Sequence, residues 1–68
     1  MKISGRNQIP GVVRDIEFGD VVSSVTIEYE CGVITSIITT ASVKELRLRP
    51  GVCVSALIKS TDVMLIRE

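Results

Sequence analysis

The sequence predicts an all-β fold, a small barrel of five to six strands with one short helix between the fourth and fifth strands. Hydrophobic residues make up 46% of the 68 residues and aromatic residues 3%, so Val and Ile have to fill the interior. Apolar and polar residues alternate with the two-residue period of half-buried strands. Strands this short leave unpaired edges unless the sheet closes on itself, which favours an OB-like barrel.

The first half of the chain predicts four strands, which are residues 2–4, 12–20, 21–30 and 33–39. Turn signals separate them at Pro10-Gly11, Gly19-Asp20 and Cys31-Gly32. The third strand alternates most clearly, because its polar residues share one face and its apolar residues the other. We expect the face that carries Val21, Ser23, Val25, Ile27 and Tyr29 to point into the core.

The second half of the chain begins with the predicted helix. Thr39 suits the N-cap position and residues 41–46 form one or two turns, although a helix N-terminus also attracts anions and Thr39 could contact a ligand. Pro50-Gly51 predicts a turn, and residues 52–59 predict the fifth strand. Ser60-Thr61-Asp62 reads as a bend before a last strand at 63–68.

Chain length and cysteine content favour an oligomer. The 68 residues form one domain, residues 1–68, and a core of this size needs a disulfide, a metal or a second subunit to become stable. Cys31 and Cys53 match no zinc spacing, the sequence has no His, and residues 1–11 lack the apolar stretch of a secretory signal. We therefore expect free, reduced cysteines, with Cys53 as a small buried hydrophobe, and a homo-oligomer.

Composition argues against several functions. Eight Lys and Arg balance eight Asp and Glu, whereas a nucleic-acid binder usually carries a basic excess and an aromatic stacking surface. No apolar run approaches the length of a membrane span, so no membrane partner is expected. No nucleophile lies beside a base and no Gly-rich phosphate loop is present, so the chain is not expected to be an enzyme.

Two short stretches pair a cation with small hydroxyl residues, Ser4-Gly5-Arg6 near the start and Lys59-Ser60 near the end. Taken singly, Lys59 reads as the solvated end of a strand, Arg6 as a surface residue and Ser60 as part of an ordinary turn. Hydroxyls, cations and a glycine backbone are also donors of the kind that bind a small dianion.

The sequence resembles the molbindins, which consist of one TOBE-like Mop domain. Three stretches carry the likeness, and together they extend over nearly the whole chain: ISGRNQIPG at 3–11, ITSIITTASVKELRLRPG at 34–51 and ALIKSTDVM at 56–64. Two departures stand out, because Gly5 replaces the usual Ala and Cys31-Gly32 replaces a Gly-rich turn.

The resemblance implies a cytoplasmic protein that stores or buffers molybdate or tungstate, bound as oxyanions, with no other metal and no organic cofactor. It also implies a hexamer built as a trimer of dimers, with the oxyanion at subunit interfaces. Carried over by position, the ligands are Ser4, Gly5, Arg6, Lys59 and Ser60. The alternatives are an OB-like nucleic-acid-binding module and an oligomerisation module without a small ligand.

Overall fold

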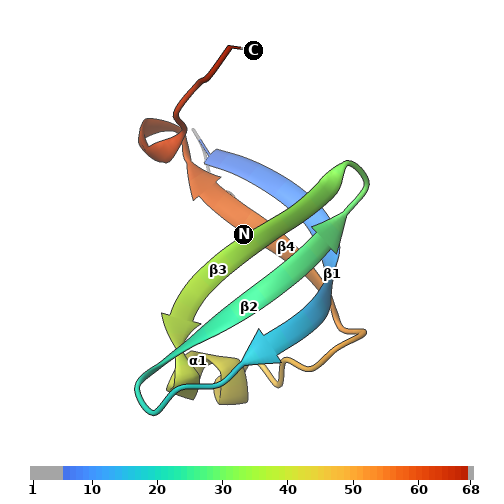
Figure 1. The fold of residues 1–68 in the computed structure, drawn as a ribbon, viewed down its shortest axis with the longest axis vertical. Helices are drawn as coiled ribbons and strands as arrows, with labels where there is room; N and C mark the ends of the chain where they lie inside the picture. The colour runs from blue at the N-terminus through green and yellow to red at the C-terminus, as the bar shows by residue number, and fades with distance from the viewer. Residues whose placement is uncertain (1–5, 68) are drawn as a thin grey trace.

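The computed structural model describes residues 6–67 and forms one curled antiparallel sheet (Figure 1). The sheet order is β3-β2-β1-β4. Its elements are β1 (Arg6–Glu17), β2 (Val22–Tyr29), β3 (Gly32–Thr39), the helix α1 (Thr40–Glu45), β4 (Cys53–Lys59) and the 3₁₀ turn η1 (Ser60–Asp62). The all-β class and the helix between the strands at 33–39 and 52–59 are therefore confirmed.

Strand β1 corrects the prediction of a break at Pro10-Gly11. The strand runs through both residues, pairing with β4 from Arg6 to Val12 and with β2 from Val12 to Glu17. Residues 6–11 of β1 pair with β4 along one edge and with no described strand along the other. Pro10, which lacks an N–H, is tolerated at such an unpaired edge. The turn signal therefore marks the point where β1 changes partner, and the predicted strand at 2–4 lies outside the described residues.

Gly11 permits this change of partner by allowing a close approach. A Cβ at Gly11 would lie 2.6 Å from the Glu28 carbonyl oxygen and 2.7 Å from Ile27 Cγ2. Real Cβ atoms do not approach other atoms so closely, so a side chain here would force β1 and β2 apart. A bulge between Val13 and Asp15 adds to the local twist, and the sheet curls into a half-barrel.

Helix α1 begins at the predicted N-cap and ends in a Schellman motif. The Thr39 hydroxyl accepts a hydrogen bond from the Ser42 amide at 3.1 Å, which confirms the predicted N-cap. At the other end, the Leu48 amide donates to Val43 O and the Arg47 amide to Lys44 O, the two bonds of a Schellman motif. Gly51, at φ 99°, then closes the Pro50-Gly51 turn, in which the Val52 amide donates to Arg49 O at 3.1 Å.

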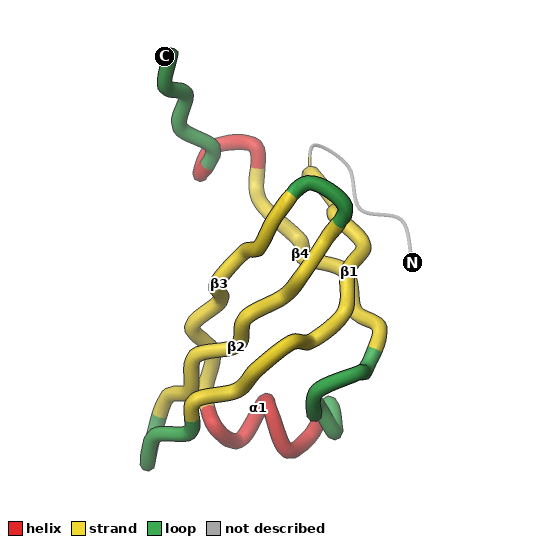
Figure 2. The backbone as a smooth tube through the Cα atoms, turned by 45° about the vertical axis from the view of Figure 1, so that its right-hand side comes forward, coloured by secondary structure: helices red, strands yellow, loops and turns green. Residues whose placement is uncertain are grey.

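The C-terminal end corrects a second prediction. Residues 63–67, expected as part of a sixth strand, form no strand and extend away from the sheet (Figure 2). Among residues 6–67 no segment pairs with the outer edges of β3 and β4, so the described chain forms a four-stranded half-barrel instead of a closed barrel of five or six strands. A strand needs a neighbouring edge, and residues 63–67 extend away from the open edges of β3 and β4.

The core of this half-barrel is small. Its buried hydrophobic residues are Val13, Val25, Ile27 and Val43. Ser23 is buried on the same face of β2, as the alternation predicts. Val21 lies before β2 and is exposed, so the predicted inward face begins two residues later than expected. Within residues 6–67 no helix is long and apolar enough to cross a membrane.

Candidate functional site

The ladder between β1 and β4 brings the two ends of the chain together. Its register runs without a shift from the pair Arg6–Lys59 to the pair Val12–Cys53. Two cationic residues from the separate sequence stretches thus lie directly opposite each other at the end of the sheet.

The remaining predicted site residues lie on either side of this pair. Ser60 follows Lys59 directly and begins η1, and both residues are exposed. Ser4 and Gly5 precede Arg6 in the chain and lie outside the described residues. The structure therefore brings Arg6, Lys59 and Ser60 to one corner of the sheet.

An acidic residue that the sequence analysis did not single out shares this corner. Lys59 and Asp62 line one shallow hollow together with Leu57 and Ile58. The carboxylate of Asp62 accepts hydrogen bonds and repels anions, so it opposes the attraction that Lys59 supplies. Asp62 follows Lys59 by three residues across a short turn, and this spacing was the sequence signal that could have indicated their closeness.

Thr39 lies far from this corner within one copy. Figure 1 shows α1 and η1 at opposite ends of the sheet, and Thr39 caps α1. Its hydroxyl is also 2.7 Å from Ser42 Oγ. The capping role predicted for Thr39 is confirmed, and the structure gives it no contact with the corner formed by Arg6 and Lys59.

Buried hydroxyls near α1 are accounted for by the fold. Thr40 Oγ1 donates to the Gly19 carbonyl at 2.7 Å and lies 2.7 Å from Ser23 Oγ. The Thr40 amide donates to Val21 O at 2.8 Å. These bonds fasten the start of α1 to the turn between β1 and β2, so the polar groups are satisfied and serve the architecture.

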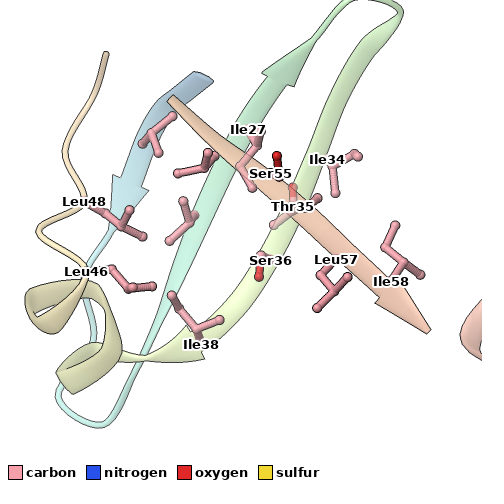
Figure 3. A pocket seen from close by; sticks show the side chains of 14 residues that line it. Ile27, Ile34, Thr35, Ser36, Ile38, Leu46, Leu48, Ser55, Leu57 and Ile58 are labelled. Carbon is pink, nitrogen blue, oxygen red and sulfur yellow. The ribbon is translucent and has the colours of Figure 1, made fainter. Parts of the chain in front are cut away.

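The concave face of the half-barrel forms an apolar trough of about 300 Å³ between β3 and β4 (Figure 3). Leu46, Leu48 and the core residues close one side of it. The residues of β3 and β4 that line this trough are Ile34, Thr35, Ser36, Ile38, Val54, Ser55, Ala56, Leu57 and Ile58. Such an open, apolar surface is what remains when a barrel lacks one strand.

The C-terminal tail, residues 63–67, carries four apolar residues before Arg67 and extends away from the sheet. Met64, Leu65 and Ile66 are 90%, 92% and 88% exposed in the single copy. Soluble chains rarely expose consecutive large apolar side chains unless another surface covers them. The trough and the tail are both apolar surfaces that the described residues leave uncovered.

The described cysteines and carboxylates form no metal centre. Cys31 and Cys53 are free thiols, as expected, but Cys53 is exposed instead of buried because it faces outward at the start of β4. In the part of the chain that the structure describes, no three His, Cys, Asp or Glu residues gather closely enough to hold an ion.

The comparison with known proteins places the chain in a family. The TOBE domain model matches residues 3–65, so the chain belongs to the TOBE domain family.

Within that family, the resemblance to Mop-type proteins is confirmed. The chain is 45% identical over 67 residues to molybdenum-pterin-binding protein 1 of Clostridium pasteurianum, covering 97% of this chain and 98% of that protein. Its fold matches a molybdate-binding protein from Sporomusa ovata with a TM-score of 0.93 and 37% identity, over 98% of this chain and 100% of that one.

A third relative extends the match to a liganded structure. The cytoplasmic molybdate-binding protein ModG, solved with molybdate bound, matches with a TM-score of 0.84 and 43% identity. The match covers 88% of this chain and 43% of ModG. The names of all three relatives describe binding and none describes catalysis.

Proposed function

We propose that this chain binds molybdate or tungstate as the intact oxyanion and stores or buffers it in the cytoplasm, without catalysing a reaction. Residues 1–68 act as one Mop-type domain, with Ser4, Gly5, Arg6, Lys59 and Ser60 as the oxyanion-binding residues. The names of the relatives support the ligand, and the description of ModG as cytoplasmic supports the location.

One observation carries the proposal, the placement of Arg6 opposite Lys59 in the β1–β4 ladder. Two positive charges balance the two negative charges of the oxyanion. Ser60 supplies a hydroxyl directly beside Lys59, and the charge-assisted hydrogen bonds of such a set are among the strongest in proteins.

The site lies at a boundary between copies in this proposal. The tail of one copy fills the trough of another, and Lys59 and Ser60 precede that tail by a few residues. Each large apolar side chain that leaves water contributes about 1.5–3 kcal/mol, so three consecutive ones give a substantial interface. A symmetric exchange forms a dimer, and dimers associate further into the hexamer that the resemblance to the molbindins implies.

Calorimetric titration of the full-length protein with sodium molybdate and sodium tungstate tests this function. Lys59→Ala is expected to weaken binding roughly tenfold or more, because a hydrogen bond to a charged group contributes about 1.5–3 kcal/mol. Lys44→Ala is the matched control, since Lys44 is an exposed lysine on α1 at the opposite end of the sheet.

The outcomes separate the proposed function from a ligand-free oligomerisation module. Binding that Lys59→Ala weakens and Lys44→Ala preserves supports the oxyanion site. If the wild-type protein assembles normally yet takes up neither oxyanion, the chain is an oligomerisation module and the proposed function is wrong.

A further inference from the structure

Asp62 places a hydrogen-bond acceptor beside the cation of the proposed oxyanion site. Lys59 ends β4, Asp62 ends η1, and the two residues line one shallow hollow with Leu57 and Ile58. Lys59 and Asp62 are exposed, and they are the charged residues of that hollow. An ammonium group only donates hydrogen bonds, and an ionised carboxylate only accepts them. The hollow therefore offers a ligand both kinds of partner.

Tetrahedral oxyanions differ in whether they carry a proton. Near neutral pH, molybdate, tungstate and sulfate carry none, whereas inorganic phosphate retains at least one. An oxygen without a proton is repelled by a carboxylate, because both groups are negatively charged acceptors. A protonated oxygen donates to the carboxylate instead, and an O–H···O⁻ hydrogen bond of this kind is short and strong. One carboxylate thus opposes the first class of oxyanion and favours the second.

The other residues of this corner do not distinguish the two classes. Lys59 attracts any dianion through its charge, and Arg6, opposite it in the β1–β4 ladder, adds a second positive charge. Ser60, the residue after Lys59, has a hydroxyl that both donates and accepts, so it suits either class. Asp62 is therefore the described residue of this corner whose chemistry responds to a proton on the ligand.

We propose that Asp62 makes inorganic phosphate a second ligand of the oxyanion site, bound as hydrogen phosphate with its proton directed at the Asp62 carboxylate. The inference rests on the proposed function, because Lys59 must contact the anion in both cases. Molybdate and phosphate then compete for one site, and molybdate binds there against the repulsion of Asp62. The amount of molybdate that the protein holds depends on the phosphate concentration as well as on the molybdate supply.

Calorimetric titration of the full-length protein with sodium phosphate and sodium sulfate at neutral pH tests this inference, because both anions are tetrahedral and only phosphate carries a proton. The wild-type protein is expected to bind phosphate roughly tenfold more tightly than sulfate, the scale of one hydrogen bond to a charged group. Asp62→Ala removes the acceptor and is expected to abolish this preference. Asp20→Ala, an exposed acidic residue in the turn at the opposite end of the sheet, is the matched control and should keep it.

The outcomes separate this inference from the proposed function. If the wild-type protein binds molybdate but binds phosphate no more tightly than sulfate, the inference is wrong and the proposed function stands. If the preference for phosphate survives in Asp62→Ala, another group accepts the proton, and the inference is again wrong. A protein that binds none of the three anions overturns the inference and the proposed function together.

Discussion

A single residue at the end of α1 carries a backbone conformation that its type disfavours. Arg47 has φ 53°, in the left-handed region, where a Cβ costs roughly 1–2 kcal/mol. Its position is C′ of a Schellman motif, which is usually occupied by glycine. Arg47→Gly is therefore expected to raise the free energy of unfolding by about 0.5–1 kcal/mol, after the greater backbone entropy of glycine is subtracted.

Urea denaturation at a fixed protein concentration measures this change. Arg49→Gly is the control, because it removes the same charge from the same loop at a residue that lacks a positive φ. That variant is expected to lose stability. Equal effects of the two substitutions would show that charge, and not the left-handed backbone, determines the stability of this loop.

At the scale of elements, the curl of the sheet depends on the close approach of β1 to β2 at Gly11. Gly11→Ala places a methyl group against the Glu28 carbonyl and Ile27, so the strands must separate. Overpacking of this kind costs about 1–3 kcal/mol, and the thermal unfolding midpoint is expected to fall accordingly. Gln8→Ala, at an exposed position on the same strand, should leave the midpoint nearly unchanged.

Some of these elements could be predicted from the sequence and others could not. Alternation and capping chemistry predicted β2, β3 and α1 because these signals lie within each segment. Pro10-Gly11 misled because local turn preference does not reveal that β1 passes from one partner strand to another. Residues 63–67 misled because their pattern identifies a strand-forming segment and does not reveal whether a strand edge lies beside it.

The candidate site was predictable only in part for the same reason. Ser4, Arg6 and Lys59 could be proposed from residue type and from the resemblance to the molbindins. The direct opposition of Arg6 and Lys59 is a property of the β1–β4 register, which no spacing in the sequence determines. Asp62 went unnoticed because an acidic residue in a turn is ordinary until the turn is seen to line a hollow with Lys59.

That hollow yields a prediction about affinity. Asp62→Asn removes a negative charge near Lys59 while it keeps the shape of the side chain. Molybdate affinity is expected to rise a few-fold. The effect is larger at low ionic strength, because salt then screens the repulsion between the carboxylate and the anion less strongly. Titrations at two salt concentrations measure this, and an unchanged or lower affinity would mean that the carboxylate does not face the anion.

The whole molecule leaves more apolar surface exposed than one copy can cover. Its buried hydrophobic core comprises Val13, Val25, Ile27 and Val43, while the tail and the trough remain open. Stability should therefore come largely from association, and the thermal midpoint of the wild-type protein is expected to rise with protein concentration. This dependence separates an assembled fold from one that is complete as a monomer.

Leu65→Asp tests whether the tail is the source of that dependence. Leu65 is 92% exposed in one copy, so the substitution costs nothing in an isolated chain but places a charge in the trough of a second copy. Sedimentation should show a smaller species, and the midpoint should no longer vary with concentration. Val21→Asp, a similarly exposed residue in the turn between β1 and β2, should preserve both properties. Full assembly of Leu65→Asp would instead mean that other surfaces hold the copies together and that the trough has a different occupant.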